Sequence, residues 1–212
     1  MNRVLIIVVA MALCACAVAR GPDSPRVLRL SPEFPAVSTP RDAGSLAVAP
    51  VQGRGLAGQR RYVYVDRAAP AELRQAASLF WEEPPPAVLQ RALIGALRGR
   101  FSTVVGPEAG VGADRRVVAR LDRFEEENGG GRQARAVVAF EAVVIAPSAR
   151  KPSFGGYYCV GAMIADGASS SRARAFEQAL AAAAAAFAAD LATGAHSRTS
   201  CEASSGAPSA PI

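Results

Sequence analysis

Cysteine offers the clearest chemistry in this sequence, which has 212 residues, four cysteines and one histidine. Two of the cysteines lie near the amino terminus, in the segment Leu13-Cys14-Ala15-Cys16. Leucine three positions before a cysteine and a small residue directly before it are typical of the bacterial lipobox, in which the cysteine sulfur is acylated. The pattern therefore predicts that Cys16 becomes the lipid-modified first residue of the mature chain.

Residues 1–15 have the composition of an export signal, with Arg3, a continuous apolar run over 4–13, and then small residues. The apolar run is too short to span a bilayer, which takes about 20 residues. Cys14 fits acylation less well, because Leu13 would stand where signal peptidase needs a small side chain. An ordinary cleaved signal with incidental cysteines is the alternative, and it stays open.

The residues after Cys16 are expected to form a short lipidated tether over 16–25. Several acyl chains on one residue anchor a protein far more durably than a single chain. Ala17, rather than aspartate, follows the cysteine, which resembles bacterial lipoproteins sorted to the outer membrane. The tether reaches at most about 30 Å when extended, so we expect the domain to stay near the periplasmic face of that membrane.

Cys159 and Cys201 would remain after signal cleavage, in a compartment that permits disulfides. A bridge between them would close a loop of about 42 residues, for which the chain-entropy model gives on the order of 4 kcal/mol. The alternative is a buried Cys159 and a free thiol at Cys201. The sequence favours neither.

The sequence offers little for catalysis or metal binding. The one histidine, His196, lies in an expected disordered tail over 195–212, which makes a Ser/His/Asp or Cys/His arrangement hard to assemble. A histidine metal site is equally hard, and no cysteine pair has zinc-ligand spacing. We therefore expect a protein that is not an enzyme, with no catalytic residue, cofactor or metal.

Two further patterns receive a structural interpretation. The glycines at 106, 110 and 112 lack the following Lys-Ser/Thr of a phosphate-binding loop, so we read an ordinary loop. The acidic residues 125–127 could bind a cation, but consecutive strand residues alternate between faces and do not all converge. We therefore expect a solvated hairpin end there.

The formal charge is +6 and the sequence pI is about 9.7, with Lys151 as the only lysine. A basic surface can attract phosphate-bearing headgroups or nucleic acid. No basic run is interleaved with aromatic residues as a nucleic-acid groove requires. We expect no nucleic-acid partner, and we read the charge as a solvated surface.

Two helices are indicated. Three prolines at 84–86 suit the first turn of a helix, and Leu89, Leu93 and Leu97 then recur every four residues along one stripe. A second helix is expected over 169–193, capped by one of the serines at 169–171 and stopped by Gly194.

Strand patterns occupy most of the remaining chain. The best pair, 116–127 and 132–145, is separated by hairpin residues at 128–131, and 132–145 is expected to bury one side only. Further strands are expected at 26–30, 46–51, 61–66, 101–105 and 154–163. The prediction is one α/β domain of the α+β type over 26–194, with a mixed, largely antiparallel sheet of about six strands and two helices packed on it.

One stretch carries a resemblance. The strand Tyr62-Val63-Tyr64-Val65-Asp66, a spacer containing Glu72-Leu73, then Phe80-Trp81-Glu82-Glu83-Pro84-Pro85 and the leucine-periodic helix resemble the ABC-type transport auxiliary lipoprotein family, the PqiC-like proteins. The similarity is clearest from about residue 46 to 105. Family members often carry a basic residue where this chain has Phe80. Trp81 and Pro84 mark the signature region, and each is interpreted either as a fold-holding residue or as an interface residue.

The resemblance implies an outer-membrane lipoprotein that works with an ABC transporter and an MCE-type periplasmic component in moving lipids or other hydrophobic molecules. It also allows a homo-oligomer. Two alternatives stay open: a periplasmic carrier that binds lipid in an apolar groove between helix and sheet, and an envelope scaffold or regulator with no transport role.

Overall fold

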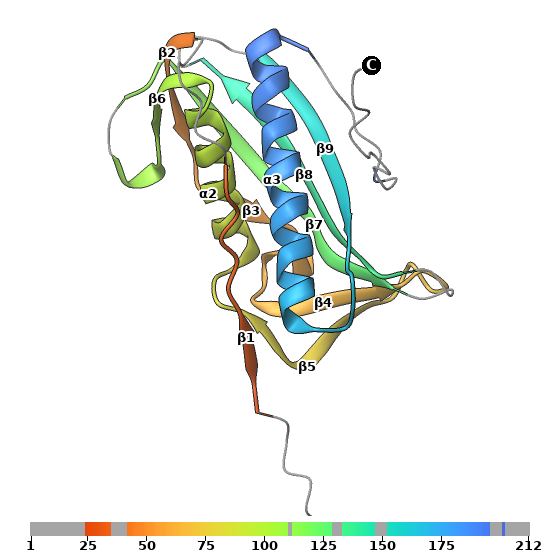
Figure 1. Cartoon of the computed structure of the whole chain (residues 1–212). Coiled ribbons are helices and arrows are strands. Elements are labelled where there is room, and N and C mark those ends of the chain that lie inside the picture. Colours follow the sequence, from red (N-terminus) through yellow and green to blue (C-terminus); the bar gives the residue numbers. More distant parts are fainter. Residues whose placement is uncertain are drawn as a thin grey trace, which may run out of the picture.

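One long strand, β7 (Arg115–Asn128), organises the sheet. In the computed structural model, which describes residues 24–34, 42–109, 112–128, 133–146, 152–195 and 201, β8 (Arg135–Ile145) pairs antiparallel along one side of β7. β9 (Phe154–Met163) pairs antiparallel with β8 and forms the next strand outward (Figure 1). The hairpin predicted from the glycine-rich residues at 128–131 is confirmed by this pairing.

The other side of β7 pairs with three shorter strands in turn, all of them parallel to it: β2 (Asp42–Val48), β3 (Gln52–Gly53) and β4 (Arg61–Asp66). β2 also pairs parallel with β6 (Phe101–Val105) and so lies inside the sheet, as expected of its apolar run. The sheet is therefore mixed, and its two longest ladders are antiparallel.

The third part of the sheet differs from the sequence expectation. The sequence predicts no strand between the spacer containing Glu72-Leu73 and Trp81, but these residues form β5 (Leu73–Trp81), which pairs antiparallel with β4 and parallel with β1 (Arg26–Leu28). Only the end of β5 is apolar and buried, so most of this strand carries no apolar alternation that sequence could reveal. With β5 and the two-residue β3, the sheet has nine strands rather than about six.

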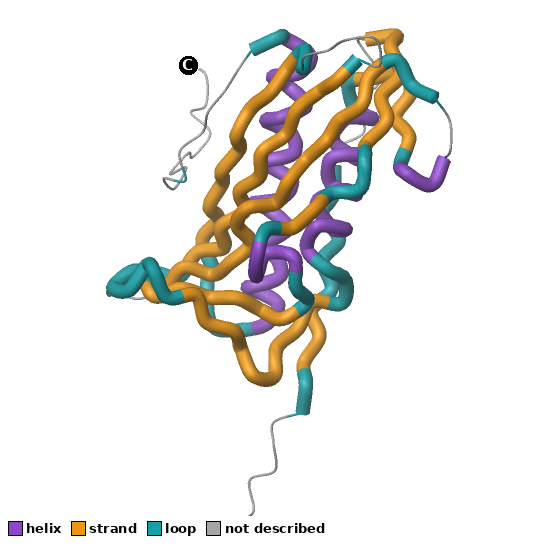
Figure 2. The backbone as a smooth tube through the Cα atoms, turned by 180° about the vertical axis from the view of Figure 1, so that it is seen from behind, coloured by secondary structure: helices purple, strands orange, loops and turns teal. Residues whose placement is uncertain are grey.

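Two long helices cover one face of the sheet, and the reverse view shows only the short helical turn at residues 55–58 on the other face, among the described residues (Figure 2). We call these the helix-covered face and the open face. α2 (Pro85–Arg98) begins at the prolines and buries its leucine stripe completely, as predicted. Short 3-10 turns, η1 (Gly55–Gly58) and η2 (Pro107–Ala109), connect neighbouring strands.

The second helix, α3 (Ser169–Thr193), ends at Gly194, whose φ of +72° is the left-handed conformation expected of a glycine stop. Its beginning corrects the sequence expectation: Ala168 is the N-cap residue, and no serine side chain caps the helix. By length and composition α3 could cross a membrane. Its apolar side instead packs on the sheet, with Phe176, Leu180 and Phe187 fully buried.

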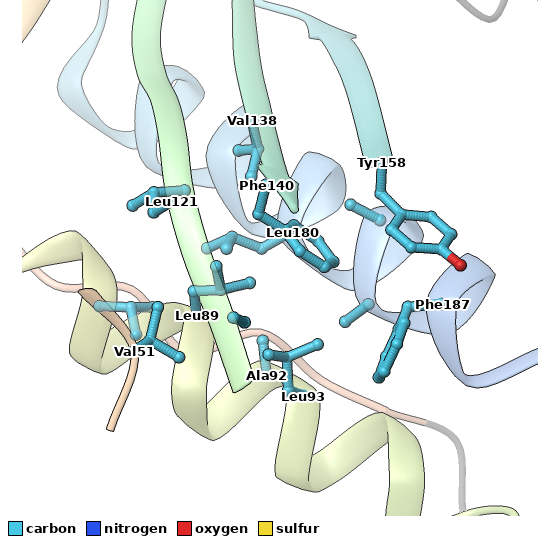
Figure 3. Close-up of a cluster of buried hydrophobic side chains, with 14 of the residues drawn as sticks. Val51, Leu89, Ala92, Leu93, Leu121, Val138, Phe140, Tyr158, Leu180 and Phe187 are labelled. Atoms are coloured by element: carbon cyan, nitrogen blue, oxygen red, sulfur yellow. The ribbon is translucent and has the colours of Figure 1, made fainter. Parts of the chain in front are cut away.

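The core lies between the helices and the sheet (Figure 3). Leucines from α2 and α3 meet apolar residues of β7 and β8, and the largest fully buried aromatic side chains are Trp81 of β5 and Tyr158 of β9. These side chains are packed with essentially no exposure to solvent, including Leu89, Leu93, Leu121, Val138, Phe140, Tyr158, Leu180 and Phe187.

The expectation that β8 buries only one side is wrong. Its Ala136, Val138 and Phe140 face the helices, but Val137 and Ala139 on the open face are equally buried. They form a second apolar cluster with Cys159, with Tyr157 and Cys201 packed against it. The face without helices therefore has a small apolar cluster of its own.

Candidate functional site

The residues singled out in the sequence fall at separate places in the fold. Trp81 and Pro84 join β5 to α2, the acidic residues end β7, and Cys159 lies in β9. Cys16, its tether and His196 lie outside the described residues, as does the tail beyond 195 except Cys201. The structure does not gather the described candidates into one site, so each is considered in turn.

Trp81 is a core residue, with 1% of its surface exposed. Its ring lies 5.1 Å from that of Tyr62, 5.2 Å from Phe124 and 4.9 Å from Phe176, measured between centroids. Edge-on aromatic contacts of this kind add to the stabilisation from buried area. Trp81 therefore ties β4, β5, β7 and α3 together, which supports the fold-holding interpretation.

One atom of this ring is unusual. The indole Nε1 of Trp81 is buried and has no hydrogen-bond partner among the described residues. Beside the ring is a cavity of about 10 Å³, lined by apolar and charged side chains that include Val88 and Glu83. A space of this size accommodates one water molecule.

Pro84 is the N-cap residue of α2, with an extended backbone (φ −57°, ψ 135°), and is exposed. Pro85 and Pro86 occupy the first helical turn, where a missing N–H costs nothing, and both are buried. Of the two signature residues, Trp81 is thus inside the domain and Pro84 is on its surface.

The acidic residues at the end of β7 are not a solvated hairpin end, as the sequence suggested. Glu125, Glu126 and Glu127 are only 7%, 5% and 8% exposed, and arginines surround them. Within the described ranges, no group of three or more His, Cys, Asp or Glu side chains is placed to hold a metal. The carboxylates are therefore structural ion-pair partners.

Glu126 points to the helix-covered face. Its carboxylate accepts a 2.5 Å hydrogen bond from the Tyr62 hydroxyl and a 2.8 Å bond from Nε of Arg172, which belongs to α3. Burial, together with the charge of Glu126, raises the pKa of Tyr62 far above its usual range. The phenol therefore stays protonated and locks the start of α3 to the sheet.

Glu127 points to the open face and binds three arginines. It accepts from Arg123 at 2.5 Å, from Arg135 at 2.7 Å and from Arg67 at 3.3 Å. Burial raises its pKa, but the hydrogen bonds and charges of Arg135 and Arg123 outweigh that effect and leave the pKa below its ordinary value. This network fastens the ends of β7, β8 and β4 together.

A bulge changes which face the later residues of β7 occupy. The register with β8 shifts between Leu121 and Arg123, which leaves Asp122 as an extra residue. Leu121 and Phe124 consequently both reach the helix-covered core. Strict alternation would have placed them on opposite faces, and for this reason the sequence did not reveal the carboxylate network.

Cys159 and Cys201 form a disulfide in the structure, with Cα atoms 4.8 Å apart. This spacing is ordinary for a bridge. The disulfide holds Cys201 against Val137 and Ala139 on the open face. It thereby covers that apolar cluster, which a sheet without helices on this side would otherwise expose.

The end of the domain nearest the amino terminus is rich in arginine. Nε and Nη2 of Arg29 bind both carboxylate oxygens of Glu82, at 2.6 and 2.7 Å, and Arg91 pairs with Glu83. The Arg29 hydrogen bond, aided by its charge, lowers the pKa of Glu82. These pairs join the segment after β1 to the start of α2.

Three shallow hollows lie at the surface, with volumes of about 330, 490 and 560 Å³. The largest is on the open face beside η1, and charged residues such as Asp122, Arg123 and Glu125 line it together with Leu73. Between the helices and the sheet, side chains of the described residues form a continuous buried apolar core.

No protein-family model matches this sequence, and no curated protein matches it. Among solved structures, protein XCC0632 from Xanthomonas campestris, assigned to the DUF330 family, superposes with a TM-score of 0.68. The two sequences are 19% identical, and the match covers 77% of this chain and 92% of that one.

A structure of an uncharacterized protein gives a TM-score of 0.61 at 13% identity, covering 80% of this chain and 99% of its own. The fold is shared. At these identities the likeness concerns the arrangement of helices and strands, and nearly the whole of each matched protein takes part in it.

Proposed function

We propose that this chain is an outer-membrane lipoprotein that serves as the auxiliary component of an ABC and MCE-type transport system for lipids or other hydrophobic molecules. It acts by docking, without catalysis: the acyl chains on Cys16 hold the domain at the membrane, and the domain receives the end of a periplasmic conduit. The observation that carries this proposal is the Trp81 to Leu97 segment, which resembles the auxiliary lipoproteins. The lipobox at residues 13–16 and a fold like that of a DUF330 protein support it.

The packing of the domain favours docking over carrying. A carrier needs an apolar space that opens for an acyl chain, and the space between helix and sheet is filled by side chains such as Leu93, Phe140 and Phe176. Opening it would create cavities that cost several kcal/mol, about 24 cal/mol for each Å³. A firm core with charged outer surfaces fits a docking adaptor.

The anchor is tested by mass spectrometry of the mature protein extracted from membranes. We expect an acylated Cys16 as its first residue, loss of acylation in Cys16→Ala, and an unchanged anchor in the matched control Cys14→Ala. A protein recovered in the soluble periplasmic fraction with an unacylated first residue would contradict the proposal.

The partners are tested by crosslinking in intact cells followed by purification of the lipidated protein. Recovery of ABC transporter and MCE-type subunits is the expected result. Recovery of cell-wall synthases without any transporter subunit would favour the scaffold role instead. Phospholipid that stays bound in stoichiometric amount after delipidation of the purified protein, detected by mass spectrometry, would favour the carrier role.

A further inference from the structure

The described chain begins close to β1, which lies at the lower end of Figure 1, and exposed side chains lie on and beside this strand. Val27 of the edge strand β1, Phe80 of β5 and Arg61 of β4 share one face of the sheet, and Arg60 precedes Arg61. Arg26 lies on the other side of β1, because its register partner is the core residue Leu79. We call Arg26, Val27, Arg60, Arg61 and Phe80 the tether-side patch. In the strand register Val27 lies opposite Phe80, and Arg61 also lies opposite Phe80, so three strands contribute adjacent residues.

The apolar side chains of this patch are unusually exposed to solvent. Val27 is 57% exposed, the highest value among the large hydrophobic side chains of the described residues. Phe80 is half-buried, and the guanidinium of Arg61 lies over its ring at 5.3 Å from the centroid. An arginine stacked on an aromatic ring keeps its charge and its outward N–H groups available.

The basic part of the patch is not neutralised. Within the described residues, neither Arg26 nor Arg61 forms an ion pair, and Arg60 donates only to the Trp81 carbonyl at 3.0 Å. Nearby, Glu82 is taken up by Arg29 and Glu83 by Arg91. This contrasts with the other end of β4 and β5, where carboxylates hold the arginines.

Position along the chain supplies the third argument. Arg26 is ten residues after Cys16, a stretch that spans at most about 35 Å. Because the tether keeps these arginines close to the membrane, the effective concentration of lipid headgroups around them is high. Attraction then sets in within a Debye length, about 8 to 10 Å in physiological salt.

We propose that the tether-side patch rests on the anionic phospholipid surface of the membrane in which the acyl chains are inserted. Arg26 and Arg61 bind lipid phosphates, and Val27 and Phe80 enter the headgroup layer between them. The proximity argument depends on the proposed acylation of Cys16. The charge and the exposed apolar side chains do not.

The contact would give the anchored domain a fixed orientation. With β1 and the start of β4 facing the lipid, the carboxyl end of α2 and the β2–β6 edge point away from the membrane (Figure 1). That far end is then the one presented to a periplasmic partner.

The test uses the mature chain from residue 16 with Cys16→Ser, which lacks acyl chains and contains every element of the fold. We expect it to bind vesicles of equal parts phosphatidylglycerol and phosphatidylcholine in a flotation assay, and not pure phosphatidylcholine vesicles. The double variant Arg26→Gln/Arg61→Gln should bind roughly 25-fold more weakly, about fivefold for each arginine. Raising the salt concentration should abolish binding.

The matched control is Arg98→Gln/Arg116→Gln, which removes the same charge from two exposed arginines at the far end. We expect this variant to bind within about twofold of the parent. Equal weakening in both double variants would mean that net charge alone drives binding and would overturn the proposal. Equal binding to both kinds of vesicle, or none to either, would also overturn it.

Failure of this proposal is distinguishable from failure of the anchor. If the mature protein is unacylated but still binds anionic vesicles through Arg26 and Arg61, the anchor proposal fails and the patch proposal stands. If the protein is acylated but its Cys16→Ser form does not bind phosphatidylglycerol vesicles, the patch proposal fails and the anchor proposal stands.

Discussion

The two faces of the sheet are stabilised by different means, although the same three long strands build both. On the helix-covered face, Trp81, Phe124 and Phe176 belong to one continuous apolar core. In the described part of the chain no long helix packs on the open face, which depends on the Glu127 network and on the disulfide at Cys159. Where no second layer is available, charges and one covalent bond replace it.

This difference shows why the end of β7 is so acidic. Aromatic packing needs area from both sides, which only α2 and α3 provide. On the open face the strand ends are linked instead by the Glu127 carboxylate, which binds three arginines. Buried pairs of this kind fix geometry, and removal of one partner leaves the others uncompensated.

The largest expected effect is on the helix-covered face. Trp81→Ala should lower the free energy of unfolding by about 4 kcal/mol, because it opens a large cavity among aromatic rings. Trp81→Phe should cost only about 1 kcal/mol, since it keeps much of the packing and removes the unpaired N–H. Urea unfolding measures both. An equal loss in the two variants would mean that the Nε1 atom makes a valuable bond, for example to a trapped water.

The same pair of variants separates the two roles of Trp81. If complex formation in cells falls in step with stability, the residue acts through the fold. Loss of partner binding by Trp81→Ala at an unchanged melting temperature would contradict the core assignment.

The next effect concerns the open face. Cys201→Ser should lower the free energy of unfolding by about 3 to 4 kcal/mol, because it removes the constraint that the bridge places on the unfolded chain. Amide exchange in β8 near Val137 should become faster as well. Reductant should reproduce both changes in the parent protein and leave Cys201→Ser unaffected. Two reactive thiols in the unreduced mature protein would rule the bridge out.

A smaller loss is expected from the carboxylate network. Glu127→Gln should cost about 2 kcal/mol, less than a fully buried pair would, because water partly screens Arg123. The control is Glu141→Gln, whose partner Arg120 and own side chain are both about half exposed. It should cost less than about 1 kcal/mol. Similar losses in thermal unfolding would show that burial of Glu127 confers no added strength.

The least pronounced effect is a dependence on pH. The folded-state pKa of Glu127 lies below its ordinary value of 4.5, so the unfolded chain takes up a proton first as the pH falls. The stabilisation by Glu127 is therefore complete above about pH 4.5 and decreases as the pH falls towards the folded pKa. Parent and Glu127→Gln should converge in stability on acidification. A difference that stays constant from neutral to acid pH would contradict this linkage.

The helix-covered layer could be predicted well from the sequence. The leucines at 89, 93 and 97, the prolines before them and Gly194 each constrain the backbone or its burial locally, and the structure agrees at each of them. The β7–β8 hairpin likewise follows from its glycines. These features depend on short-range chemistry, which sequence shows directly.

The open face could not be predicted in the same way. The bulge at Asp122 changes which side every later residue of β7 faces, and nothing in its local sequence requires it. The burial of Val137 depends on Cys201, which lies more than sixty residues away in the chain. Glu127 receives its partners from three different segments. Such contacts exist only after the sheet has assembled.

The Cys159–Cys201 bridge makes the last step of folding depend on the cellular compartment. A reducing cytosol keeps thiols unpaired, so a chain that has not yet been exported would lack the bridge that covers Val137 and Ala139. Oxidation after translocation would form the bridge. If the chain is exported as proposed, secretion and formation of the bridge would be one event, and a precursor held inside the cell would be recognisable by reduced thiols at Cys159 and Cys201.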